Sequence, residues 1–350
     1  MTRTPPSAVQ LALAAEVRRC GLTATPYQLE RWRRQLWLAP TEQWTDTQAG
    51  GIRPEIVHRA AWLAALSRAG RSISWAGWTC WALDDTPQTA QRLREAVSQT
   101  LQRPLKRAGV ALSRIPQGDG DDAFEARQKM AARLLTGRRA IGRDLDGILR
   151  AHAAAAGLAL PPPRSVSNVF HTRLTEVGAR LLIGGMDDVS PEELTEAWES
   201  VWTGPREQIE RIGAAHITAE QTGIDLRALS PLAHGLRGLL RAVEEAGDRK
   251  LCAAVRTCTK ASGALMMLLG RADDDAKILA RLMDDNVMWD QWARIGGIAP
   301  DGRLGEAAIA LSTAQYLLVP GWAEDLTRYQ ALMDTLLATP AAPDDDGLER

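Results

Sequence analysis

Apolar residues recur at helical spacing from the first turns of the chain onward, with breaks at glycines and prolines. The pattern over 7–20 opens on a serine, which is a common helix cap, and stops at Gly21. A second segment over 25–38 opens on Thr25-Pro26, a capping side chain followed by proline at the first helical position. Its inward face carries large apolar residues at i, i+3 and i+7: Leu29, Trp32 and Leu36. The spacing predicts two short helices joined by a tight turn.

A polar stretch over 41–53 follows the second helix and ends in two glycines, Ile52 and Arg53. It is too short and too polar for a helix with its own apolar face. We therefore predict a small β-hairpin with the glycines at its tip or in its return strand. A third helix is predicted over 54–70 and a fourth over 75–83. The fourth has a tryptophan at every third position, typical of a packed core or a dimer seam: Trp75, Trp78 and Trp81.

The remaining chain keeps helical patterns and shows no convincing strand. Residues 88–114 are predicted to form one helix or two, broken at Pro104, and residues 116–122 (PQGDGDD) have the composition of a linker. Further along, the run from Ser190 to Glu193 has the spacing of a capping box. Ala, Leu, Arg, Glu and Gln dominate the chain, whereas Val, Ile, Tyr and Phe are scarce. This composition favours an all-α fold.

Composition divides the chain into four parts. Residues 1–90 contain the helix pair, the hairpin and the helices after it, and residues 91–160 form a basic helical segment with the linker near 116–122. Residues 161–339 are predicted to form an acidic all-helical domain that serves assembly or an effector. Residues 340–350 are acidic and contain proline, so we expect a disordered tail.

The net charge of −1 conceals a strong asymmetry along the chain. Residues 1–150 contain 23 Lys and Arg against 14 Asp and Glu, a net charge of +9. Residues 151–350 contain 19 against 29, a net charge of −10. A basic front half and an acidic back half indicate a polyanion-binding module joined to a part that does not bind nucleic acid.

Several classes of protein are excluded by the sequence. No run approaches the roughly 20 uncharged apolar residues of a membrane helix, and the first ten residues lack the apolar stretch of a signal peptide. We therefore expect a cytoplasmic protein with no membrane partner. The histidines are scattered, and nucleotide-binding and hydrolase motifs are absent. We expect no catalytic residue, no cofactor and no enzyme activity.

The cysteines give no sign of a metal site. None of the four stands in a C-x-x-C pair, and each lies in a helical apolar pattern: Cys20, Cys80, Cys252 and Cys258. A zinc site would need closer clusters with histidine nearby. We therefore expect buried free thiols and no bound metal.

Two stretches carry a resemblance to a known family. The sequences TPYQLERWRRQLWLAP (25–40) and GGIRPEIVHRAAWLAALSRAGRSISWAGWTCWAL (50–83) resemble the MerR-type winged helix-turn-helix, a module that excisionase-like phage proteins share. The resemblance spans residues 8–84. It implies that the second helix enters the major groove of DNA and that an arginine at the end of the wing meets the backbone.

Single positions can be compared with the family's pattern. Arg53 matches the wing arginine, and Leu29 and Trp32 match packed apolar positions. Three positions depart from the pattern. Glu30 stands in place of a groove-facing arginine, Leu36 in place of a helix-ending glycine, and Pro54 in place of a tyrosine after the wing arginine.

The resulting expectation is an N-terminal winged helix-turn-helix with a minimal β-wing. Helix 25–38 would contact the major groove and the wing near 41–53 the backbone. Arginine and glutamine can bind phosphates and read guanine and adenine edges. The candidate DNA-binding residues are Thr25, Tyr27, Gln28, Arg31, Arg33, Arg34, Gln43 and Arg53.

The leading hypothesis is a sequence-specific DNA-binding protein, a transcriptional regulator associated with the nucleoid when it is bound to double-stranded DNA. Winged-helix proteins commonly bind DNA as dimers that read inverted half-sites, so we expect a homodimer. The acidic domain would assemble the dimer, meet a protein partner or bind a small-molecule effector.

Two alternatives belong to other classes. One is an all-helical enzyme or ligand-binding protein with an acidic site around Asp284, Asp285 and Asp290. Such a cluster in a helical chain resembles the magnesium–diphosphate site of isoprenoid synthases, although no basic clamp is evident. The other is a phage- or plasmid-type architectural protein that bends DNA.

Overall fold

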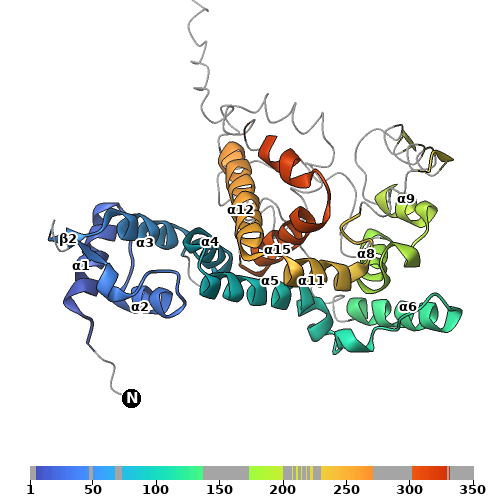
Figure 1. The fold of residues 1–350 in the computed structure, drawn as a ribbon, viewed down its shortest axis with the longest axis horizontal. Coiled ribbons are helices and arrows are strands. Elements are labelled where there is room, and N and C mark those ends of the chain that lie inside the picture. The colour runs from blue at the N-terminus through green and yellow to red at the C-terminus, as the bar shows by residue number, and fades with distance from the viewer. Residues whose placement is uncertain are drawn as a thin grey trace, which may run out of the picture.

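The structure of the protein is a computed structural model. It describes residues 5–46, 50–67, 73–136, 173–199, 230–270 and 302–328, with isolated residues between 207 and 223 and at 331. These residues are mostly helical, as the composition predicts, and the strands among them form one two-stranded sheet. Figure 1 shows a blue N-terminal lobe at one end of the molecule and helices of all later colours packed beyond it. None of the described helices is long and apolar enough to cross a membrane.

The N-terminal lobe, which we define as residues 5–67, contains three helices and a hairpin. Its elements are α1 (Ala8–Arg19), α2 (Pro26–Arg34), the 3-10 turn η1 (Thr41–Gln43), β1 (Thr45–Asp46), β2 (Gly51–Ile52) and α3 (Pro54–Leu66). Helix α1 packs against both α2 and α3. Their shared core holds fully buried side chains from all three helices, Leu13, Leu29, Trp32 and Leu63, together with Trp44, which precedes β1.

Local capping fixes the helix pair, and the expected caps are confirmed. Ser7 accepts from the backbone N–H of Gln10, whose side chain in turn accepts from the backbone N–H of Ser7. Gly21, with φ of +77°, adopts the left-handed conformation that ends α1. Thr25 and Gln28 then form a second capping box with Pro26 at the first helical position.

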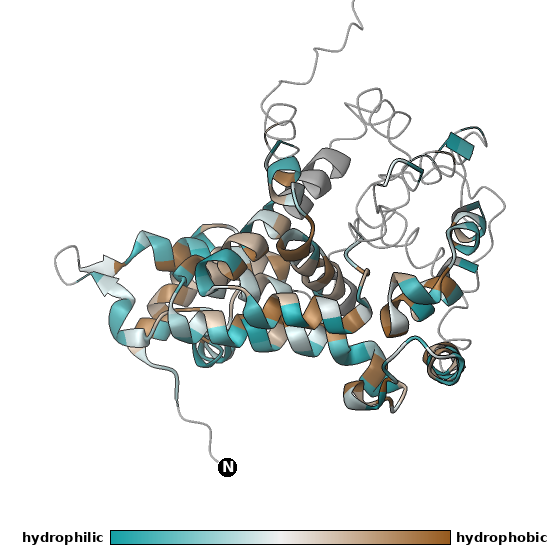
Figure 2. Ribbon diagram, turned by 45° about the vertical axis from the view of Figure 1, so that its right-hand side comes forward, coloured by the Kyte–Doolittle hydropathy of each residue, from teal (hydrophilic) through white to brown (hydrophobic). Residues whose placement is uncertain are grey.

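The second part, which we call the helical body, consists of the described helices after residue 86. They are α5 (Pro87–Arg107), η2 (Leu112–Arg114), α6 (Asp121–Thr136), α8 (Arg173–Gly184), η5 (Met186–Asp188), α9 (Pro191–Glu199), α11 (Gly235–Glu245), α12 (Asp248–Gly270) and α15 (Gly302–Leu318). The capping box predicted at Ser190 and Glu193 is confirmed and starts α9. Figure 2 shows hydrophilic and hydrophobic bands alternating along the helices, which is the mark of one buried face per helix.

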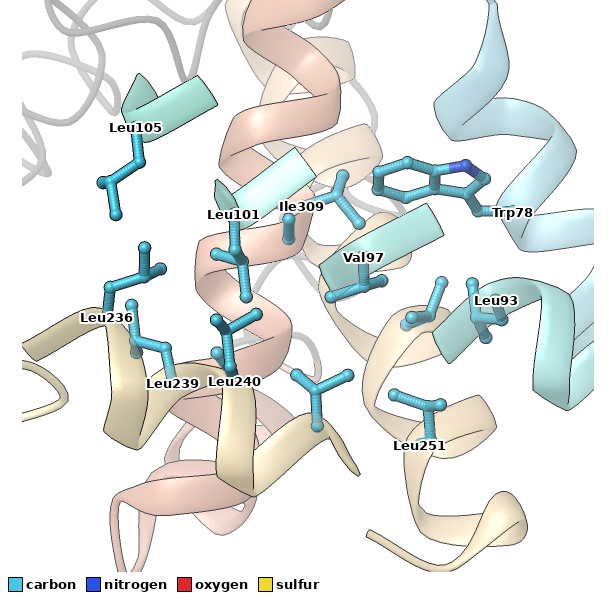
Figure 3. Packing of buried hydrophobic residues seen from close by; sticks show 14 of the residues in the cluster. Trp78, Leu93, Val97, Leu101, Leu105, Leu236, Leu239, Leu240, Leu251 and Ile309 are labelled. Atoms are coloured by element: carbon cyan, nitrogen blue, oxygen red, sulfur yellow. The ribbon is translucent and has the colours of Figure 1, made fainter. Parts of the chain in front are cut away.

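Helix α5 lies at the centre of the body and packs against α11, α12 and α15. Figure 3 shows its Leu93, Val97 and Leu101 in one cluster with Leu240 of α11, Leu251 of α12 and Ile309 of α15. Residues before 137 therefore share a core with residues after 230, although composition assigned them to separate domains. The boundary placed at 160 lies outside the described residues.

Helix α4 (Ser74–Asp84) joins the lobe to the body, and its tryptophan stripe is a packed core. Ala76 and Cys80 lie in the core of the lobe, whereas Trp78 lies in the core of the body. Trp75 and Trp81 pack against both. The stripe therefore fills the seam between the two parts of one chain.

Ion pairs inside the helical body join the basic front half of the sequence to its acidic back half. Arg94 pairs with Asp248 at 2.9 Å, and Arg103 pairs with Glu306 at 2.6 Å. Each arginine belongs to the basic half of the sequence and each carboxylate to the acidic half. Part of the charge asymmetry is therefore neutralised inside the fold and does not form a basic surface.

Two expectations from the sequence are corrected by the fold. Helix α5 continues through Pro104, because Leu101 and Leu105 are buried on either side. Burial of two leucines, worth about 1.5–3 kcal/mol each, compensates for the proline, which costs about 3 kcal/mol in a helix interior. Cys20 is an exposed residue at the end of α1 rather than a buried thiol.

The end of α2 is the third correction. The helix stops at Arg34, so Leu36 lies beyond it and is only half-buried, and the apolar face continues through buried Trp37 and Leu38. The backbone N–H of Trp37 donates to the Trp32 carbonyl at 2.8 Å. With Leu36 at φ of +56°, this is a Schellman ending built on a leucine in place of glycine.

We expect Leu36→Gly to be more stable than Leu36→Ala by about 1 kcal/mol. Both variants lose the same side-chain packing, but only glycine adopts the left-handed conformation without a steric penalty. Urea denaturation followed by circular dichroism measures the difference in the free energy of unfolding. Equal stability of the two variants would show that Leu36 does not hold this conformation in solution.

Candidate nucleic-acid interface

The outer face of α2 is polar and exposed. Tyr27, Glu30, Arg31 and Arg34 stand at i, i+3, i+4 and i+7, which places them on one side of the helix. Arg31 is exposed, and the Tyr27 residue has 68% of its surface exposed. The opposite side carries Leu29 and Trp32, both fully buried. The helix therefore presents one polar stripe while its apolar stripe holds it in the lobe.

Two of the predicted DNA contacts serve the helix start. The Gln28 side-chain carbonyl accepts from the Thr25 backbone N–H at 2.8 Å and from its hydroxyl at 3.0 Å. The Thr25 hydroxyl in turn accepts from the Gln28 backbone N–H at 3.2 Å. Both side chains are thus positioned by the backbone of α2, and their polar atoms are already partly used.

Glu30 is the centre of a hydrogen-bond network on α2. Its carboxylate accepts from Arg33 Nε at 2.8 Å, from Arg33 Nη2 at 2.7 Å and from Arg34 Nε at 2.7 Å. Gln10 of α1 donates to the same carboxylate at 3.2 Å. The hydrogen bond with Arg33 is the largest cause that lowers the pKa of Glu30, to about 2, against the opposing effect of burial. Glu30 is therefore charged at neutral pH.

The hairpin lies beside α1 and has the predicted glycines in its turn and return strand. Thr45 pairs with Ile52 and Asp46 with Gly51 in antiparallel register, and Gly50 has φ of +69°. The chain entering the hairpin is anchored by Trp44, which is fully buried and donates from Nε1 to the Ala39 carbonyl at 2.7 Å. The first strand of the hairpin is therefore anchored in the core of the lobe.

The two remaining candidates lie on either side of the hairpin. Gln43 is exposed in η1, directly before β1. Arg53 follows β2, and its Nε donates to the Thr45 carbonyl at 3.4 Å. The Arg53 side chain keeps 47% of its surface exposed and lies 3.9 Å from Glu55. It can reach a phosphate, but a neighbouring carboxylate competes for it.

The lobe is only weakly basic. Residues 5–67 contain seven Arg and no Lys against five Asp and Glu, a net charge of +2. The candidates come together as two groups: α2 holds Thr25, Tyr27, Gln28, Arg31, Arg33 and Arg34, and the hairpin region holds Gln43 and Arg53. Gln10 of α1, which contacts Glu30, was not among the residues predicted for the site. The spacing of Glu30 from Arg33 and Arg34, i+3 and i+4, is the signal that would have found the ion pairs.

The enzyme alternative depends on three acidic residues. Asp284, Asp285 and Asp290 lie outside the described residues. Within the described ranges no cluster of His, Cys, Asp and Glu could hold a metal ion. Burial raises the pKa of the Cys80 thiol and of the Cys258 thiol to about 12 each, so both stay protonated at neutral pH. These thiols are packed apolar groups rather than nucleophiles.

Comparisons with protein-family models, with curated proteins and with solved structures find no match for this chain.

Proposed function

We propose that the N-terminal lobe binds double-stranded DNA, with α2 in the major groove and the hairpin against the backbone. The observation that carries the proposal is the outer face of α2, where Tyr27, Arg31 and Arg34 lie exposed on a helix fixed from behind by Leu29 and Trp32. A short helix of this kind, held by a preceding helix across a tight turn, fits the width of the major groove. The protein would act as a transcriptional regulator.

The three arginines of α2 differ in how far each can contact DNA. Arg31 is exposed and has no ion pair among the described residues, so it suits a base edge or a phosphate. The Arg34 side chain is 74% exposed and keeps terminal nitrogens beyond its contact with Glu30. The Arg33 side chain is 33% exposed and gives two nitrogens to Glu30, so it contributes less to direct contact.

We expect the double substitution Arg31→Ala and Arg34→Ala to weaken DNA binding at least tenfold near 0.1 M salt, since each contact to a base edge is worth about 1–3 kcal/mol. Binding is measured by electrophoretic shift on fragments selected from genomic DNA by the full chain. A matched control, Lys129→Ala with Arg328→Ala, removes two equally exposed charges from outside the lobe. If the control weakens binding as much as the test variant, α2 is not the contacting helix.

The same selected fragments test the form of the complex. Inverted half-sites one helical turn apart would indicate a homodimer, whereas single half-sites would indicate a monomer. A bending assay on a selected fragment distinguishes a promoter-specific regulator from an architectural protein. Full-length protein with no salt-sensitive affinity for any DNA would overturn the proposed function.

A further inference from the structure

An acidic side chain stands at the edge of the polar face of α2 that lies next to α1. Glu30 lies one turn from both Tyr27 and Arg34 and adjacent to Arg31. A carboxylate at this place does not help a surface to attract phosphates, because its negative charge is repelled by the negative charge of DNA. The carboxylate therefore has a role other than attracting phosphates.

The hydrogen bonds of Glu30 indicate what that role is. One oxygen accepts from Arg33 and Arg34, each at 2.7 Å, and the other accepts from Arg33 at 2.8 Å and from Gln10 at 3.2 Å. Both oxygens already accept two hydrogen bonds each, so the carboxylate is not available to accept a hydrogen bond from a base edge. It acts on the arginines instead.

The network also ties α2 to α1. The carbonyl oxygen of Gln10 is used by the capping box with Ser7, which leaves its amide nitrogen to donate to Glu30. The position of Glu30 is thus fixed from the neighbouring helix as well as from its own. Two flexible arginine side chains, each of which loses considerable rotamer entropy when it is ordered, are held in place before any ligand arrives.

We propose that Glu30 is a specificity-determining positioning residue. It holds Arg33 and Arg34 in one arrangement and lowers the affinity of α2 for DNA of arbitrary sequence. The inference rests on the proposed function. Its physical basis is that non-specific binding depends on the charge presented to phosphates, whereas specific binding also depends on pre-placed donors.

The test uses the full chain with Glu30→Gln, which keeps the shape of the side chain and removes its charge. We measure affinity for a selected fragment and for a random-sequence fragment over a range of salt concentrations. Glu30→Gln should bind the random fragment about threefold to tenfold more tightly, with a salt dependence steeper by about one unit in the log–log slope. The ratio of specific to non-specific affinity should fall.

Two further variants separate charge from position. Glu16→Gln removes an equal charge from α1 and should leave the specificity ratio near the wild-type value. Among the described residues, Glu16 pairs with its own helix neighbour Arg19 alone. Glu30→Asp keeps the charge but is too short to reach both arginines. It should keep the low non-specific affinity and lose affinity for the selected fragment.

The outcomes distinguish the two proposals. If the wild-type chain binds DNA but Glu30→Gln leaves both affinities and the salt slope unchanged, the role of Glu30 is overturned and the proposed function stands. If Glu16→Gln matches Glu30→Gln in every measurement, overall charge explains the effect and the inference is again overturned. If the wild-type chain binds no DNA, the proposed function itself fails, and the inference fails with it.

Discussion

Replacing Asp188 with alanine is expected to destabilise the helical body by about 3–5 kcal/mol, because the substitution leaves a buried guanidinium without its counter-charge. Asp188 is 1% exposed and accepts from Arg127 Nε at 2.9 Å and from Arg127 Nη2 at 2.7 Å. The carboxylate raises the pKa of Arg127. Without this partner the guanidinium still stays protonated at neutral pH, because arginine is effectively always charged in proteins. The remaining hydrogen bond, from Arg127 to the Gly118 carbonyl, cannot replace a carboxylate.

Urea denaturation followed by helical circular dichroism measures the loss. The matched control is Glu125→Ala, which breaks an ion pair with Lys129 on the same helix, where both side chains are more than two-thirds exposed. An exposed pair of this kind contributes at most about 0.5 kcal/mol. A second substitution, Arg127→Met, should recover part of the stability that Asp188→Ala loses. If Asp188→Ala costs no more than the control, the pair is not buried in solution.

A methyl group at position 77 is the second change for which we expect a large effect. A change from glycine to alanine inside a helix normally stabilises it by about 1 kcal/mol, because glycine is a poor helix former. Here a Cβ would lie 1.9 Å from Cε2 of Trp37, and the Trp37 indole is itself buried. We expect destabilisation by about 3 kcal/mol, as for a strongly overpacked core.

The control for Gly77→Ala is Gly178→Ala in α8, where nothing lies within 4 Å of the added methyl group. That variant should gain about 0.5–1 kcal/mol. Opposite signs for two chemically identical substitutions would show that the contact between α4 and Trp37 decides the result. Stabilisation by both would mean that Trp37 does not lie on Gly77.

This contact also matters for the proposed DNA-binding helix. Trp37 lies three residues after the last residue of α2. Trp81 of α4 donates from its indole to the carbonyl of Gln35, which caps the end of α2, at 2.8 Å. On its other side, α4 is held to α12 by the hydroxyls of Thr79 and Thr259 at 3.1 Å. The end of α2 is therefore fixed to the helical body through one helix. Gly77→Ala should weaken DNA binding as well as stability.

The starts of helices could be predicted because each depends on residues within one turn. Ser7, Thr25 and Ser190 cap their helices through hydrogen bonds to a residue three positions later. Pro54 begins α3 for the same local reason. The ends of helices were harder to predict from the sequence. Leu36 ends α2 in a conformation that favours glycine, and only the packing of Trp37 and Leu38 behind it makes that ending stable.

The candidate site was predicted as a set of residues but not as an arrangement. The polar face of α2 follows from its period, whereas the reach of Gln10 to Glu30 depends on how α1 crosses α2. The weight given to the basic front half was also changed by the structure. Arg94 and Arg103 contribute to that charge, yet both face carboxylates of the back half.

By itself, the sequence determined the mostly helical character of the described residues, the capped helix pair, the small hairpin and the exposed stripe on α2. All of these depend on propensity and periodicity over a few residues. The tertiary structure alone decided that α4 joins two cores, that Trp37 requires glycine at position 77, and that Arg127 is buried against Asp188. Such contacts join residues that are distant in sequence. Their energies depend on burial and fit, which no local pattern contains.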